Sequence, residues 1–127
     1  MARELWPQPL TIRVQPHSGL PSKVLKQLGG TKSKIGVRIP GDPLARTIVS
    51  IMGKPLLVSS ANRERKAGDS SPAQVRKTFG GRVDVFVDKG DLKPEPLSTV
   101  IDVVDGKVVV ERPGAISEQT LARYVRV

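Results

Sequence analysis

Apolar residues recur along the chain with two different periods, and the two periods predict strands and helices. Alternation of apolar and polar residues is typical of a half-buried strand, whereas apolar residues three or four positions apart are typical of an amphipathic helix. Alternation or a short apolar run predicts strands at 10–14, 35–39, 55–58, 83–87, 98–104 and 107–111. Helical spacing behind a capping residue predicts helices at 22–28, 43–52, 72–79 and 118–124.

The order of these elements predicts an α/β (α+β) fold, with a twisted mixed parallel and antiparallel sheet flanked by helices in a single domain spanning 1–127. Asp105 and Gly106 between two strands are a strong signal for a tight hairpin. Ligands of open α/β sheets bind beyond the ends of strands. Arg38, Ser60 with Asn62, and Arg112 lie at or near predicted strand ends, and Ser98 lies where a strand begins, beside the end of an antiparallel neighbour. We therefore expect these four groups to face one common rim.

Charge and composition narrow the choice of partners. The formal net charge of +9 favours a polyanionic partner such as a nucleotide, tRNA or ribosomal RNA, although a solvated basic surface explains the charge equally well. Aromatic residues make up only 3% of the chain, so RNA contacts are expected mainly through phosphates. The single tryptophan, Trp6, is expected to anchor the core rather than to stack on a base.

Several classes of site are excluded by residues that the chain lacks. It has no cysteine and one histidine, His17, which excludes disulfides, thiolate metal sites and His-clustered zinc sites. No apolar run approaches the roughly 18 residues of a membrane helix and no signal peptide is evident, so we expect a cytoplasmic protein without membrane contact. Nucleotide-binding glycine loops and nucleophile motifs are also absent. Catalysis would therefore have to depend on positioning and charge neutralisation.

The residue pattern alone leaves two interpretations for each candidate residue. Arg38 is either a water-facing arginine of an edge strand or a guanidinium that binds a carboxylate or phosphate. Ser59, Ser60 and Asn62 form either an ordinary turn or a group that binds phosphate oxygens. Arg112 either ends a strand or reaches a nucleotide.

Five phrases of the sequence, taken together, resemble the YrdC family, whose members include threonylcarbamoyl-AMP synthases. They are W-P-Q-P-L-T at 6–11, V-R-I-P-G-D-P at 37–43, G-K-P-L-L-V-S-S-A-N at 53–62, S-T-V-I-D at 98–102 and R-P-G-A-I at 112–116. The resemblance implies a mixed sheet around a concave basic cavity. It also implies that threonine, bicarbonate and ATP are condensed to threonylcarbamoyl-AMP and pyrophosphate, for modification of an adenosine in tRNA.

The same resemblance implies a set of binding residues, with no catalytic residue assigned and no metal ligand. For ATP these residues are Lys34, Ser60, Asn62, Gly68 and Arg112. For threonine they are Arg38, Val58 and Ser98. ATP would be bound as a substrate, alone or with Mg²⁺, and no tightly bound cofactor is implied.

The chain also departs from the family pattern. Gln8 replaces a usual glycine, Lys34 stands where a threonine is usual, and R-E-R-K follows Asn62. The family's opening segment, with its P-T-[ED]-T-x-Y-G-L and K-x-R motifs, has no counterpart, so we expect an N-terminally truncated domain. Three explanations stay open: a start further upstream, which we favour, a partner chain that supplies the segment, or a non-catalytic remnant. The alternative function is a non-catalytic module that binds double-stranded RNA or a nucleotide, and a weaker one is a structural partner that completes another chain's sheet.

Overall fold

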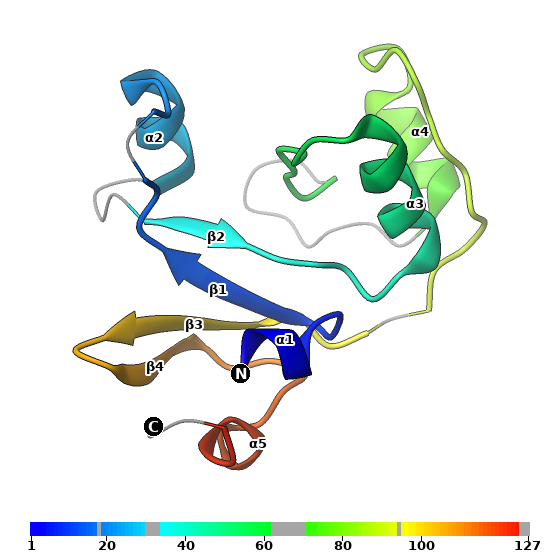
Figure 1. Ribbon diagram of the computed structural model, residues 1–127. Helices are drawn as coiled ribbons and strands as arrows, with labels where there is room; N and C mark the ends of the chain where they lie inside the picture. Colours follow the sequence, from blue (N-terminus) through cyan, green and yellow to red (C-terminus); the bar gives the residue numbers. More distant parts are fainter. Residues whose placement is uncertain (18, 30–33, 62–70, 94, 125–127) are drawn as a thin grey trace. The chain divides into compact units, whose positions relative to one another are not determined.

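The computed structural model describes residues 1–17, 19–29, 34–61, 71–93 and 95–124. Their elements are labelled in Figure 1. The chain divides into two compact units, the first made of Met1–Lys54 with Pro96–Val127 and the second of Pro55–Glu95.

The first unit is built on a four-stranded sheet. Its strands are β1 (Leu10–Val14), β2 (Ile35–Val37), β3 (Thr99–Val104) and β4 (Lys107–Arg112), in the order β2-β1-β3-β4. β1 pairs with β3 in parallel, whereas the other two pairs are antiparallel. The predicted mixed sheet is confirmed.

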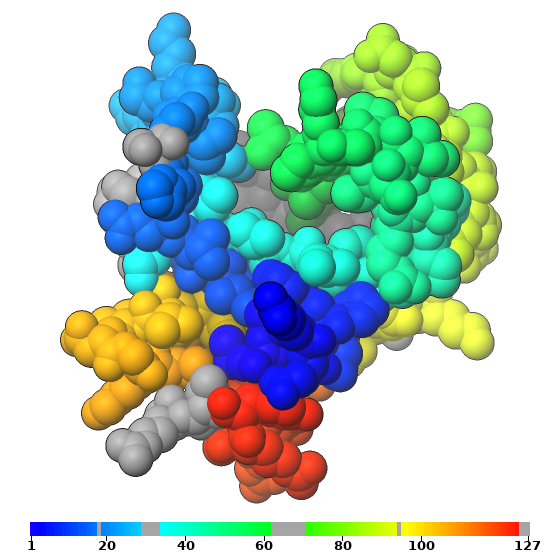
Figure 2. All heavy atoms as spheres, in the orientation of Figure 1, coloured from blue at the N-terminus to red at the C-terminus, as the bar shows by residue number. Residues whose placement is uncertain are grey.

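One face of this sheet carries the core. Alternation along the strands points Leu10 and Ile12 of β1 and Ile101 of β3 to the same face, where all three are buried. Two short helices, α1 (Ala2–Leu5) and α5 (Glu118–Ala122), add Leu5 and Leu121 to the same apolar cluster. The N-terminal segment and the C-terminal helix accordingly lie against each other in Figure 2.

The expected role of Trp6 as an anchor of the core is confirmed. Its indole ring is half-buried against the apolar cluster, and its Nε1–H donates a hydrogen bond of 2.9 Å to the carbonyl of Leu10. The hairpin prediction is confirmed as well. Asp105 and Gly106 adopt φ angles of 50° and 75°, the left-handed conformation that a two-residue turn of this type requires.

The helices follow their local signals. α2 (Ser22–Gly29), α3 (Pro43–Met52) and α4 (Pro72–Phe79) lie where the sequence predicts them, whereas α5 ends earlier than expected. α3 has both of its predicted ends: Asp42 accepts a hydrogen bond of 2.9 Å from the Ala45 N–H, and Gly53 ends the helix at φ 62°. No helix among the described residues has the length and apolar character needed to cross a membrane.

Two predicted strands are wrong. Residues 55–58 and 83–87 lie in the second unit and form no strand. Val58 is 86% exposed, so 55–58 is not the buried strand that its apolar run suggests. Val85 is 77% exposed, so 83–87 does not bury one face as its alternation suggests. The physical reason is the lack of a neighbour: among the described residues no backbone hydrogen bond joins either segment to another strand. In the first unit, β2 ends at Val37 rather than Ile39, because Pro40 disfavours further pairing.

Candidate functional site

Three polar side chains meet where β3 begins. Ser98 stands directly before β3 and is buried, and its Oγ lies 3.1 Å from the Oγ1 of Thr11 on β1. Arg112, the last residue of β4, donates from Nη2 to the Ser98 carbonyl at 2.9 Å and to the Ser98 Oγ at 3.2 Å. The register explains the meeting, because β1 runs parallel to β3 and the antiparallel β4 ends where β3 starts. Of the predicted residues, Ser98 and Arg112 are thereby brought together.

Gly114 makes this arrangement sterically feasible. A Cβ at this position would lie 2.3 Å from the Leu97 carbonyl oxygen and 2.5 Å from the Thr99 nitrogen, so only glycine fits. The next residue, Ala115, donates its N–H to the same Leu97 carbonyl at 2.9 Å. Thr99 Oγ1 also donates to the Ile116 carbonyl at 2.7 Å and accepts from its N–H at 2.9 Å. The segment that follows Arg112 is thus tied to the segment that contains Ser98.

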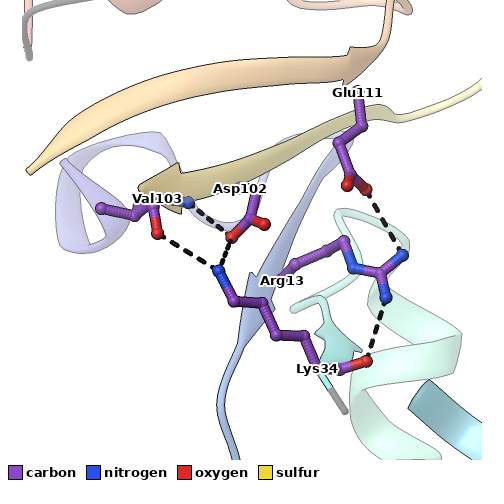
Figure 3. A network of polar contacts seen from close by, with 5 residues as sticks. All are labelled: Arg13, Lys34, Asp102, Val103 and Glu111. Atoms are coloured by element: carbon purple, nitrogen blue, oxygen red, sulfur yellow. Dashed lines mark hydrogen bonds and ion pairs between the residues drawn. The ribbon is translucent and has the colours of Figure 1, made fainter. Parts of the chain in front are cut away.

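A second polar group crosses the same sheet (Figure 3). Lys34 precedes β2, and its Nζ lies 2.6 Å from Oδ1 of Asp102 on β3 and 3.3 Å from the Val103 carbonyl. Arg13 of β1 donates from Nη1 to Glu111 of β4 at 3.3 Å and from Nη2 to the Lys34 carbonyl at 3.1 Å. Each ion pair skips one strand, so the four side chains together link every strand of the sheet.

The charge state of Asp102 follows from these contacts. The Lys34 hydrogen bond lowers the pKa of the Asp102 carboxyl below its usual value, and burial partly opposes this. The Val103 N–H, at 2.7 Å, and the positive charges of Lys34 and Arg13 lower the pKa further. Asp102 is therefore a carboxylate at neutral pH, although it is only 6% exposed.

The remaining predicted residues fall in different places. Arg38 is exposed and directly follows β2 in the first unit. The ammonium group of Lys34 forms an ion pair with the carboxylate of Asp102. Val58 and Ser60 are exposed residues of the second unit and follow no strand. Asn62 and Gly68 lie outside the described residues.

The sequence pattern does not predict the partners that hold these side chains. They are Thr11, Arg13, Asp102, Glu111 and Gly114. A signal was present for the residues of β1. Thr11 and Arg13 alternate with the apolar Leu10 and Ile12, so the strand period places them on the polar face of the sheet.

The second unit contains a hollow of about 610 Å³ that involves none of the predicted residues. Its lining comprises Pro72, Ala73, Arg76, Lys77, Asp88, Gly90 and Asp91. Arg76 pairs with Asp88 at 3.1 Å and lies over the Phe86 ring, 4.6 Å from its centroid. Cations and carboxylates are mixed in this lining, which gives the hollow no clear preference for an anion. Nowhere in the described ranges do three or more His, Asp or Glu side chains gather as a metal site would need.

Comparison with known proteins identifies a family. The family model for Sua5/YciO/YrdC, described as telomere recombination, matches residues 1–114. The chain is 28% identical, over 98% of its length, to the threonylcarbamoyl-AMP synthase of Pyrococcus abyssi and covers 36% of that protein. It is 35% identical, over 84% of its length, to the threonylcarbamoyl-AMP synthase of Neisseria gonorrhoeae and covers 54% of it. The chain thus spans about half, or less, of these relatives.

Solved structures show the same fold. The crystal structure of P. abyssi Sua5 complexed with L-threonine matches 98% of the chain with a TM-score of 0.81 and 26% identity, over 36% of that structure's chain. The crystal structure of Escherichia coli YciO matches 93% of the chain and 56% of its own, with a TM-score of 0.77. At 24% identity, the likeness to YciO concerns the fold alone.

Proposed function

Because this chain belongs to the Sua5/YciO/YrdC family, we propose that it recognises L-threonine and ATP in the formation of threonylcarbamoyl-AMP for tRNA modification. The observation that carries the proposal is the meeting of Ser98 and Arg112 on the polar side of the sheet. One guanidinium nitrogen of Arg112 is held by Ser98. Among the described residues no acceptor contacts its Nη1 or Nε, which leaves donors for an anion.

In the proposed site two anionic ligands lie next to each other, and the chain supplies the charge that lets them do so. In the first unit Arg38 binds the threonine carboxylate and Ser98 contacts the amino acid. Val58 is the threonine contact that the resemblance implies in the second unit. Arg112 of the first unit binds the nucleotide. Ser60, Asn62 and Gly68 are the nucleotide contacts that the resemblance implies in the second unit. Guanidinium and hydroxyl groups in these positions reduce the repulsion between a carboxylate and a triphosphate.

The proposed reaction needs no protein nucleophile. The threonine amine adds to bicarbonate with loss of water, and an oxygen of the resulting carbamate attacks the α-phosphorus of ATP. The bond to the β-phosphate breaks and pyrophosphate leaves with the electron pair. ATP acts as a substrate, alone or with Mg²⁺, and the chain contributes orientation and charge neutralisation.

Ligand titration by calorimetry tests the proposal on the full chain. Arg38→Ala is expected to weaken threonine binding and Arg112→Ala to weaken ATP binding, each by about 10–100-fold, because each removes a charged hydrogen-bond donor. Arg123→Ala removes an exposed arginine that directly follows α5 in the sequence. It is the matched control and should change neither affinity. If the folded wild-type chain binds neither ligand, the proposal is wrong. ATP binding that survives Arg112→Ala would overturn the assignment of that residue.

A non-catalytic module that binds double-stranded RNA or a nucleotide is the second candidate, favoured by the net charge of +9. Pyrophosphate release from ATP that depends on both threonine and bicarbonate separates the two functions, since only the synthase produces it. The binding module predicts RNA affinity that falls steeply as salt rises, because phosphate contacts release counterions. RNA affinity that hardly changes between low and physiological salt would count against it.

A further inference from the structure

We propose that Lys34 and Asp102 form a clamp that positions Arg38, so that Lys34 acts on threonine binding through β2 instead of touching the ATP phosphates. The inference rests on the proposed function, since it takes Arg38 as the residue that binds the threonine carboxylate. It concerns a positioning role, and the observation behind it is the ion pair of 2.6 Å between the two side chains.

Arg38 depends on a strand that is weakly held by its own ladder. β2 has three residues, and among the described residues it lies at the edge of the sheet and pairs only with β1. Its last paired residue is Val37, opposite Ile12, and Arg38 follows immediately. A ladder of this length is marginal by itself. Whatever else fixes β2 therefore also fixes the backbone from which the Arg38 side chain extends.

The clamp supplies that fixation at the other end of β2. Lys34 directly precedes β2, and its side chain passes β1 to reach Asp102 and the Val103 carbonyl on β3 (Figure 3). Its own carbonyl accepts from Arg13, which is in turn paired with Glu111 on β4. Lys34 is held at both its backbone and its ammonium, and β2 is thereby joined to the three other strands.

The chemistry of the pair argues against Lys34 as a phosphate ligand. Two of the three ammonium hydrogens face acceptors, Asp102 Oδ1 and the Val103 carbonyl. If the ammonium swung to a phosphate, the carboxylate of Asp102, which is only 6% exposed, would lose the cation that pairs with it. Leaving a buried charge unpaired is strongly unfavourable. The ammonium is therefore expected to stay on Asp102 when ATP binds.

A close approach of β2 to β1 connects the clamp to Ser98, the second residue of the first unit that is proposed to bind threonine. A Cβ added to Gly36 on β2 would lie 3.1 Å from Cγ2 of Thr11, so β2 packs tightly on β1 at this point. Thr11 is the residue whose hydroxyl contacts Ser98. A displacement of β2 would therefore reach Arg38 directly and Ser98 through Thr11, and both belong to the proposed threonine site.

Calorimetric titration of the full chain with threonine and with ATP, separately, tests the clamp. Lys34→Met keeps the aliphatic stem without the charge, and Asp102→Asn keeps the shape without the charge. Each is expected to weaken threonine binding about 10-fold with ATP affinity changed less than about twofold, and the double variant should be no worse than either single one. Lys34→Arg, which restores a cation, should recover most of the threonine affinity. Arg76→Met and Asp88→Asn, in the exposed ion pair of the second unit, are the matched controls and should change neither affinity.

The alternatives give different patterns. If Lys34→Met weakens ATP binding about 10-fold or more while Asp102→Asn leaves it unchanged, Lys34 is a phosphate contact and the clamp is wrong. Equal weakening of both ligands in both variants would reduce the pair to general stability, which also overturns it. A wild-type chain that binds neither ligand would refute the proposed function, whereas variants with unchanged threonine affinity would refute the clamp alone.

Amide hydrogen exchange covers the case in which Asp102→Asn does not fold. In Lys34→Met, faster exchange is expected at residues 36–38 with unchanged exchange in β3 and β4, because the clamp acts on the edge strand. Unchanged exchange at 36–38 would overturn the clamp.

Discussion

The two units of the chain contain segments with the same alternation but different outcomes. Thr99–Val104 in the first unit forms β3 between β1 and β4 and buries Ile101 completely. Residues 83–87 in the second unit also alternate, yet they form no strand and leave Val85 77% exposed. Alternation therefore indicates which face of a sheet each side chain would occupy. Whether the segment becomes a strand depends on neighbours that supply hydrogen bonds.

Helices do not show this dependence on neighbours. α3 in the first unit and α4 in the second both form, although neither has a fully buried residue. Their hydrogen bonds lie within the segment, and a proline at the first turn favours each start. The comparison thus separates structure that is encoded locally from structure that needs distant partners.

The largest expected difference between the units is in amide hydrogen exchange. Amides of β3 should be protected at least about 100-fold more than those of residues 83–87, because the ladder opens only when the core opens. Exchange measured by mass spectrometry or NMR at neutral pH provides the test. Equal protection of the two segments would mean that 83–87 has a stable pairing partner, and the comparison would fail.

The same distinction explains how much of the fold could be predicted. The ends of α3 and the Asp105–Gly106 turn depend on local capping and φ preferences, so the sequence predicts them at the right residues. α1, with four residues, is not predicted, and α5 ends two residues earlier than predicted. The parallel pairing of β1 with β3 joins distant segments, and no local pattern specifies it. The strands predicted at 55–58 and 83–87 failed because an apolar run does not reveal whether a partner exists.

The candidate site was predictable to a similar degree. The phrases pointed to Ser98 and Arg112, and the structure places them in contact. The resemblance implies Lys34 as a nucleotide contact, because it stands where the family usually has a threonine, but its ion pair with Asp102 depends on the strand order. Thr11 was visible as a polar residue on β1, whereas its contact with Ser98 required the register.

A glycine in each unit gives the next largest contrast. Gly114→Ala should destabilise the first unit by about 3 kcal/mol, because its Cβ would overlap backbone atoms that cannot move aside cheaply. Gly81→Ala in the second unit meets nothing within 4 Å and should change stability by less than about 0.5 kcal/mol. Urea unfolding followed by Trp6 fluorescence reports on the first unit, and circular dichroism reports on both. A tolerated alanine at 114 would show that the close approach to Leu97 is relaxed in solution.

One carboxylate in each unit, Asp102 in the first and Asp88 in the second, allows the pH dependence of stability to be compared. The pKa of Asp102 is lowered, so its contribution to stability is fully present above about pH 4, the ordinary pKa, and is lost as the pH falls through the lowered value. Asp102→Asn should cost about 1–2 kcal/mol at pH 7, and the cost should disappear in strong acid. The pKa of Asp88 is lowered as well, by the Gly90 N–H and by Arg76, but Asp88 is well exposed and Asp88→Asn should have little effect. Unfolding by urea at pH 7, 4 and 2.5 measures both.

The smallest expected contrast lies in two serines that precede helices. Ser117 accepts a hydrogen bond of 3.2 Å from the Thr120 N–H at the start of α5, whereas Ser71 before α4 makes no such side-chain bond. Ser117→Ala should therefore cost about 1 kcal/mol, and Ser71→Ala only a few tenths, since it removes no bond. α5 carries the buried Leu121, so the loss at Ser117 should appear in the Trp6 unfolding curve of the first unit. Equal costs would mean that Ser71 also caps its helix in solution, and the second unit would then be better ordered at this helix start than its contacts indicate.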